Sequence, residues 1–166
     1  MSAPVVVFAV GNPSRGDDAL GPELCGRLEK WLKNENLTEQ VDLIEDFQLQ
    51  IEHALDLQSR KLALFIDAGQ HTKSPYEFGP TAPVDRIGHS THALEPGSVL
   101  QVYKDTEGGE PPPAFTLCVA GLSFELGQPI SLQAKANADA AFALICQLMQ
   151  SPELTAWSAL VVQDAA

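Results

Sequence analysis

The chain has 166 residues, 45% of them hydrophobic, which favours one globular domain and excludes a disordered chain. Its formal net charge of -12 argues against nucleic acid and anionic membranes as partners. Its three cysteines lack C-x-x-C spacing, which disfavours structural zinc and a disulfide framework and fits a reducing cytoplasm.

An apolar run at residues 5–10 opens the predicted fold and is too short for a secretion signal or a membrane span. Four of its six residues are valine, a composition typical of a strand buried on both faces. Turn-forming residues follow at 11–16, then the adjacent acids Asp17 and Asp18, and then a predicted amphipathic helix over residues 19–33. Because the two acids precede this helix, they can cap its free N–H groups, and we predict capping as the main role of Asp17.

The middle of the chain is predicted to form a strand at 41–45, a helix at 47–57 and a strand at 62–66. One face of that helix would carry its apolar residues, which are Phe47, Ile51, Ala54 and Leu55. His53 and His71 are expected at the surface. The order strand, helix, strand, helix, strand, with short connections, implies a parallel sheet with right-handed crossovers.

The stretch 67–97 is the least regular, with four prolines and three histidines, and long loops inside a compact domain are often functional. Residues 98–104 fit either a strand or a short helix. A buried strand is predicted at 115–120 and a long helix at 134–150. The Ser-Pro pair at 151–152 starts a new element, because serine caps helices and proline suits their first turn.

These elements predict an α/β fold with residues 1–150 as a single three-layer domain. A mostly parallel, twisted sheet of about five strands would have helices on both faces. Residues 151–166 would form a helical tail packed on this domain or on a partner.

Asp18 and Asp67 both follow buried strands, and loops at the carboxyl ends of parallel strands form the ligand crevice of such folds. The two carboxylates can therefore share one crevice. With an imidazole from His89 or His92, they would suit a divalent metal of borderline softness. Taken singly, however, an aspartate after a strand is more often a cap or turn residue, and a loop histidine is often simply solvated.

Most familiar enzyme motifs are absent, including the G-x-S-x-G elbow and the H-E-x-x-H zinc motif. The loop at 11–16 has the glycine spacing of a phosphate-binding loop but lacks the lysine that must follow it. Asp17 and Asp18 would repel a phosphate there, so nucleotide binding is disfavoured.

Four motifs resemble those of the nickel–iron hydrogenase maturation endopeptidases. The run 11–21 is similar to the opening G-N-x4-D-[DE]-x2-G motif, and the Asp-Ala pair at 67–68 to the second motif. His92, with leucines two and eight positions later, resembles the third motif, and the strand at 115–121 the fourth. The resemblance extends from about residue 5 to residue 149.

This resemblance implies that Asp18, Asp67 and His92 contact a metal, and that residues 96–104 are helical. Members of the family cut a C-terminal extension from the hydrogenase large-subunit precursor after nickel insertion. The nickel belongs to the substrate, so no permanently held cofactor is expected. Asp18 or Asp67 would act as the base if a water molecule attacks the scissile bond.

The sequence departs from the family pattern in two places. Ala9 replaces a glycine that many members have, and the residues at 46–50, Asp-Phe-Gln-Leu-Gln, replace a Gly-Gly-Thr turn. Asp46 matches the acid before that turn, which implies a role in substrate recognition. This version looks more like the branch that serves cytosolic NAD-reducing hydrogenases.

We therefore predict a cytoplasmic, monomeric endopeptidase with the hydrogenase large-subunit precursor as its partner, and with no nucleic acid or membrane partner. Two alternatives stay open. The first is a noncatalytic chaperone that holds the nickel site of the same precursor without cutting it. The second is a small nucleotide-binding protein that uses the loop at 11–16.

Overall fold

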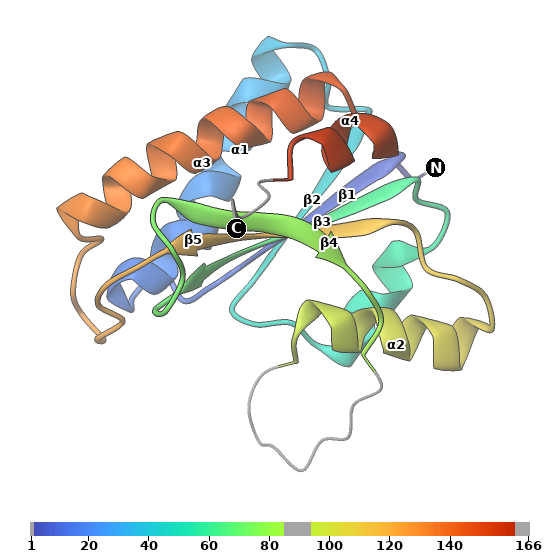
Figure 1. The fold of residues 1–166 in the computed structure, drawn as a ribbon, viewed down its shortest axis with the longest axis horizontal. Helices are drawn as coiled ribbons and strands as arrows, with labels where there is room; N and C mark the ends of the chain where they lie inside the picture. The colour runs from blue at the N-terminus through green and yellow to red at the C-terminus, as the bar shows by residue number, and fades with distance from the viewer. Residues whose placement is uncertain (1, 85–93, 162–166) are drawn as a thin grey trace.

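A single five-stranded sheet forms the centre of the computed structural model, which describes residues 2–84 and 94–161 (Figure 1). The strand order is β2-β1-β3-β5-β4. The strands are β1 (Val5–Val10), β2 (Val41–Asp46), β3 (Leu62–Gly69), β4 (Tyr76–Thr81) and β5 (Ala114–Ala120). Neighbours run parallel except β4, which pairs antiparallel with β5.

Helices cover both faces of this sheet (Figure 1). One face carries α1 (Leu20–Asn34), α3 (Leu132–Gln150) and α4 (Leu154–Ala159). The other face carries the short helix η2 (Ile51–Leu57) and α2 (Pro96–Glu107). The predicted three-layer α/β domain with a mostly parallel sheet is confirmed. Within the described residues, no helix combines the length and apolar character needed to cross a membrane.

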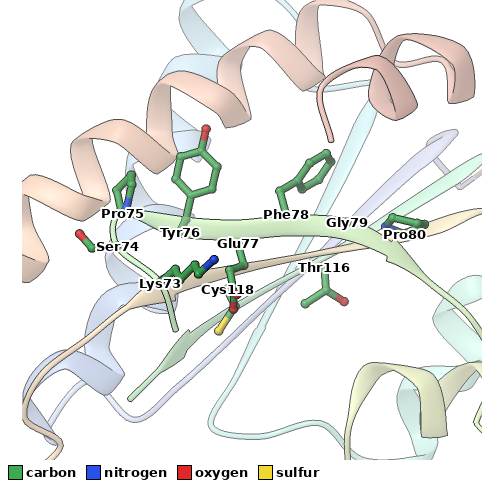
Figure 2. A pocket seen from close by; sticks show the side chains of 10 residues that line it. All are labelled: Lys73, Ser74, Pro75, Tyr76, Glu77, Phe78, Gly79, Pro80, Thr116 and Cys118. Carbon is green, nitrogen blue, oxygen red and sulfur yellow. The ribbon is translucent and has the colours of Figure 1, made fainter. Parts of the chain in front are cut away.

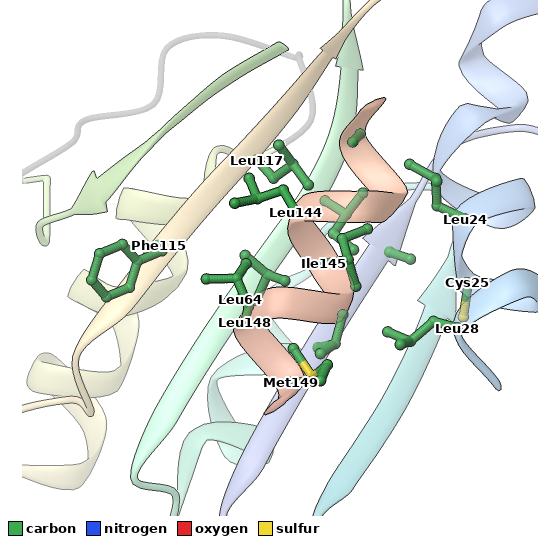
Figure 3. Close-up of a cluster of buried hydrophobic side chains, with 14 of the residues drawn as sticks. Leu24, Cys25, Leu28, Leu64, Phe115, Leu117, Leu144, Ile145, Leu148 and Met149 are labelled. Carbon is green, nitrogen blue, oxygen red and sulfur yellow. The ribbon is translucent and has the colours of Figure 1, made fainter. Parts of the chain in front are cut away.

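The core has two halves because successive strand residues point to opposite faces of the sheet. Figure 3 shows one half, where α1 and α3 pack on the sheet. Its members include Leu24, Leu28, Leu64, Phe115, Leu117, Leu144, Ile145 and Leu148. In the other half, Val6, Phe8 and Phe65 pack against η2 and α2. Every residue of β1 is buried, which explains its continuous apolar run.

The sheet has an edge strand, β4, in the stretch that was predicted to be irregular. Pro80 lies within β4, and proline is tolerated there because one side of an edge strand needs no ladder hydrogen bonds. The helix α2 resolves the ambiguity at 98–104 in favour of a helix. β3 continues to Gly69, so Asp67 lies inside this strand and not just after it.

The predicted apolar face of a helix at 47–57 is wrong in part. Only residues 51–57 are helical, and they form a 3-10 helix, whose period differs from that of the predicted α-helix. Phe47, Ile51 and Leu55 are 64%, 60% and 59% exposed. The residues that face the sheet are Leu49, His53, Ala54 and Leu57. The expected surface position of His53 is therefore also wrong.

Helix α4 packs its one tryptophan into the domain. Trp157 is fully buried, and its indole N–H donates to the carbonyl oxygen of Leu148 at 2.8 Å. The ring also meets Phe115 edge-on, with 5.5 Å between centroids. This contact holds α4 on the same face as α3.

Candidate functional site

Two glycines force the loop after β1 into close contact with the start of α1. Gly11 has a φ of 150°, and a Cβ there would lie 2.0 Å from the carbonyl oxygen of Asp18. A Cβ on Gly21 would lie 2.2 Å from the carbonyl oxygen of Val10. Only glycine fits at either position, so the spacing of these glycines places Asp18 beside the carboxyl end of β1.

Backbone N–H groups in this loop are consumed by partners within the protein. Asn12 N–H donates to Asp18 Oδ2 at 2.7 Å, and Ser14 N–H donates to Asn12 Oδ1 at 2.9 Å. The remaining donors of residues 11–18 reach carbonyl oxygens, which belong to Asp46, Asn12, Gln128, Ser123 and Arg15. A phosphate cradle needs several free N–H groups, and the donors of this loop are already engaged. The geometry therefore argues against the nucleotide-binding alternative.

Asp17 does not cap a helix, contrary to the prediction. It is fully buried, and the carboxylate accepts hydrogen bonds from the loop between β5 and α3. Leu122 N–H and Ser131 N–H donate at 2.7 Å, Ser131 Oγ–H at 2.9 Å and Ser123 N–H at 3.2 Å. Burial acts to raise the pKa of this carboxyl, but these hydrogen bonds outweigh it and hold the pKa below its usual value. Asp17 thus ties two loops together beneath Asp18.

Asp18 and Asp67 come together at the carboxyl ends of β1 and β3, which are neighbours in the sheet. Asp67 Oδ1 accepts a hydrogen bond from Ala68 N–H at 2.7 Å. The pKa of Asp67 is raised to about 6, because burial and, to a smaller extent, the nearby charge of Asp18 raise it more than the Ala68 N–H lowers it. The two predicted carboxylates therefore share one electrostatic site.

The position of this pair follows the topology. After β1 the chain crosses to β2 on one side and then returns to β3 on the other side, so β1 and β3 flank a switch point. Crevices at such points are the usual ligand sites of open α/β sheets. His89 and His92 lie outside the described residues, so the structure does not place His92, the predicted histidine ligand. Within residues 2–84 and 94–161, no three His, Cys, Asp or Glu side chains form a metal-binding group.

A pocket of about 610 Å³ lies beside Asp67, along β4 and β5 (Figure 2). Cys118 pairs with Asp67 on one side and Glu77 on the other, so the three residues share one face of the sheet. Figure 2 shows Glu77 and Cys118 on the opposite side of β4 from Tyr76. Sequence reasoning missed this pocket because it missed β4, and the alternation of Tyr76 and Phe78 was the available signal.

The thiol of Cys118 is poorly suited to be a nucleophile. Burial raises its pKa, and the neighbouring charges of Asp67 and Glu77 raise it further. The Thr72 hydroxyl, 3.0 Å from Sγ, acts in the other direction but does not reverse the shift. Cys118 therefore stays a neutral thiol in the wall of the pocket.

Asp46 ends β2, on the other side of β1 from Asp67. Its Oδ1 accepts from Phe47 N–H at 2.8 Å, and its Oδ2 lies 3.3 Å from His53 Nε2. The ends of three adjacent strands thus carry Asp46, Asp18 and Asp67 in a row, with Asp46 the most remote from the pocket.

Solved structures similar to this chain share its fold over most of its length. The NiFe hydrogenase maturation protease HycI from Thermococcus kodakarensis KOD1 has a TM-score of 0.66 and 24% identity, over 90% of this chain and 94% of that one. The hydrogenase maturating endopeptidase HybD from Escherichia coli has a TM-score of 0.66 and 19% identity, over 91% and 94%. An endopeptidase from Escherichia coli has a TM-score of 0.66 and 21% identity, over 91% and 94%.

The sequence matches no protein-family model and no curated protein. The structural likeness nevertheless covers 90% and 91% of this chain in the first two of these structures. The chain therefore has the fold of the hydrogenase maturation proteases.

Proposed function

We propose that this protein is an endopeptidase that removes the C-terminal extension of a nickel–iron hydrogenase large-subunit precursor after nickel insertion. The observation that carries this proposal is the acid pair Asp18–Asp67 at the switch point of a fold shared with hydrogenase maturation proteases. Three of the five specified positions of the opening motif also have clear structural reasons, since Gly11 and Gly21 bring Asp18 to the end of β1.

Nickel recognition needs ligands that leave room for the substrate's own donors. Asp18 and Asp67 supply two carboxylates, and His92 would add an imidazole. Structural metal sites are normally closed by four protein ligands, so three ligands leave the site open. Thiolates of the precursor would complete the coordination and favour nickel. The nickel is then part of the substrate, and the protein holds no metal permanently.

Peptide hydrolysis at this site uses water as the nucleophile. Water adds to the carbonyl carbon of the scissile bond, a carboxylate of the acid pair takes its proton, and the C–N bond breaks as the amine leaves with a proton. Either Asp18 or Asp67 serves as this base. Cys118 does not replace water as the nucleophile, because its raised pKa keeps the thiol neutral.

Mass spectrometry of a purified precursor tests this proposal directly. Incubation of the nickel-loaded precursor with the protein should reduce its mass by that of the C-terminal extension, whereas nickel-free precursor should stay intact. A stable complex with no change in mass would instead support the noncatalytic chaperone. Rapid cleavage of nickel-free precursor, or a stoichiometric metal in the protein as purified, would point to an ordinary metalloprotease.

The two loop histidines provide a matched pair of variants. His92→Ala should abolish cleavage, because this residue matches the third family motif, and His89→Ala should leave it unchanged. The reverse result would show that the motif is aligned three residues out of place.

Residues 46–50 bear on which precursor is cut. Their Asp-Phe-Gln-Leu-Gln sequence favours the precursor of a cytosolic NAD-reducing hydrogenase. A protease for that precursor would be cytoplasmic, and we propose that it acts as a monomer. Cleavage assays with precursors of NAD-reducing and membrane-bound hydrogenases would compare the two directly. Equal rates on both would argue against this assignment, and size-exclusion chromatography would report the oligomeric state.

A further inference from the structure

The hydrogen bond that His53 accepts determines which of its two ring nitrogens is the acceptor. The side chain is only 9% exposed, and the ring meets Phe8 edge-on with 5.6 Å between centroids. Gln50 N–H donates to Nδ1 at 2.8 Å. A backbone N–H can only donate, so Nδ1 must be the unprotonated acceptor. The ring proton therefore lies on Nε2, which faces Asp46 Oδ2 at 3.3 Å.

The Nε2 edge of the ring is thus turned toward the Asp46 carboxylate, in a polar contact of 3.3 Å. The cap at the start of η2, in which Nδ1 accepts from Gln50 N–H, fixes the orientation of the ring. His53 thus presents its Nε2 edge to Asp46 in one defined direction. The bond from Phe47 N–H and the contact with His53 use only part of the accepting capacity of the Asp46 carboxylate.

Asp46 is also placed where a protein partner can reach it. Its side chain is 37% exposed, and the neighbouring Phe47 and Ile51 present apolar side chains to solvent. Apolar groups clustered around a charged acceptor are typical of a protein contact surface. A partner group that fits Asp46 is a cationic or N–H donor.

We infer that His53 is a positioning residue that holds the Asp46 carboxylate as an anionic acceptor for a donor group on the precursor. This inference rests on the proposed function, in which the precursor is the partner. Asp46 lies across β1 from Asp67, so the contact contributes to binding of the precursor and not to bond cleavage. His53 therefore affects KM and leaves kcat unchanged.

Two substitutions separate the contact with Asp46 from the cap. Glutamate and glutamine at this position of a helix both accept the N-cap N–H, so His53→Glu and His53→Gln retain the bond from Gln50. Only glutamine can also donate to Asp46, whereas glutamate places a second negative charge beside it. Glu52→Gln, on the exposed side of η2, controls for a general change of charge.

Cleavage kinetics on the nickel-loaded precursor test the inference. His53→Glu and Asp46→Ala should each raise KM about tenfold, the effect of one hydrogen bond to a charged group, with kcat within about twofold. Because the two residues act as one unit, the double variant should be no worse than Asp46→Ala alone. His53→Gln should restore KM to within about threefold of the wild type, and Glu52→Gln should not change it.

Nitrogen-15 NMR of the histidine rings gives a readout that does not depend on cleavage. The neutral ring of His53 should be the tautomer with a protonated Nε2 and an unprotonated Nδ1. The opposite tautomer would overturn the inference, as would an unchanged KM in His53→Glu or additive effects in the double variant. Absence of cleavage by the wild-type protein would instead defeat the proposed function itself.

Discussion

Asp17 and Asp18 are adjacent in the chain, yet the structure uses them in opposite ways. Asp17 is fully buried and accepts four hydrogen bonds from one distant loop, which lower its pKa. Asp18 is partly exposed, accepts from Asn12 N–H, and raises the pKa of Asp67 by its charge. The carboxylate of Asp17 has all its hydrogen bonds from groups within the protein. The carboxylate of Asp18 instead lies near that of Asp67, and the two negative charges repel each other.

The comparison separates a structural acid from a functional one by how its charge is compensated. A carboxylate whose oxygens are all paired within the protein stabilises the fold and has little capacity left for a ligand. Repulsion between two carboxylates held close together lowers the free energy of unfolding. Such repulsion is common at sites where a cation binds. Predictions that substitute these acids singly can test the distinction.

Asp18→Ala should have the largest effect of the variants on the cleavage rate, and it should leave the fold intact. Loss of a group that contacts the nickel or activates water should lower the rate on the order of 1,000-fold. The fold should tolerate the change, because one partly exposed hydrogen bond to Asn12 N–H is worth about 1 kcal/mol. Mass spectrometry of the precursor and circular dichroism of the variant measure the two quantities. Cleavage at the wild-type rate by a folded variant would remove Asp18 from the site.

Asp17→Ala should have the largest effect on stability. The substitution removes the fully buried carboxylate that accepts from Leu122, Ser123 and Ser131 N–H, which should cost about 3 kcal/mol. Urea unfolding of this variant beside Asp18→Ala gives the comparison. Equal stability of the two variants would contradict the structural role of Asp17.

The difference in stability between the wild type and Asp17→Ala should depend on pH, because the pKa of Asp17 is lowered. An acid whose folded pKa is depressed contributes stability that is present above its unfolded pKa and is lost as the pH falls through the folded pKa. The stability gap between the wild type and Asp17→Ala should therefore narrow on acidification and stay constant around neutral pH. A gap that widened in acid would reverse the sign of the assigned shift.

Asp67→Asn should abolish cleavage and stabilise the metal-free protein. The folded pKa of about 6 lies above the unfolded value of about 3.9, so the charged form is disfavoured by folding. The stability that this group contributes is complete below about pH 4 and is lost as the pH rises through about 6. At pH 7, removing the charge should raise the free energy of unfolding by up to about 3 kcal/mol, and at pH 4 it should change almost nothing. Thermal unfolding in a chelator at both values is the measurement, and a variant less stable than wild type at pH 7 would contradict it.

Local patterns were enough to predict most of the fold. The valine-rich run of β1 and the three-and-four spacing in α1 are each contained in one short window, and the structure has both elements where they were expected. The acid pair was also predictable as a geometric arrangement, because parallel strands place their carboxyl ends on one edge. Asp18 and Asp67 do lie together there.

The errors arise where the partner is distant or the local pattern is ambiguous. Asp17 was assigned to capping because its true partners, Leu122 and Ser131, lie more than 100 positions away, at separations of 105 and 114 residues. β4 was missed because Pro80 disguises an edge strand that pairs with β5. His53 was a different kind of error, since Gln50 and Asp46 are close in sequence and the cap was a local signal.

The smallest effect on stability is expected at the exposed apolar residues of η2. Ile51→Ser and Leu55→Ser should change the free energy of unfolding by less than about 0.5 kcal/mol, because these side chains are 60% and 59% exposed. Leu57→Ala, at a fully buried position of the same 3-10 helix, should cost about 2 to 5 kcal/mol. An α-helix over 47–57 with its apolar side inward would instead make Ile51→Ser as damaging as Leu57→Ala. Urea unfolding of the three variants therefore tests the face assignment, and a several-fold loss of precursor affinity in Ile51→Ser, with normal stability, would place this surface in the contact around Asp46.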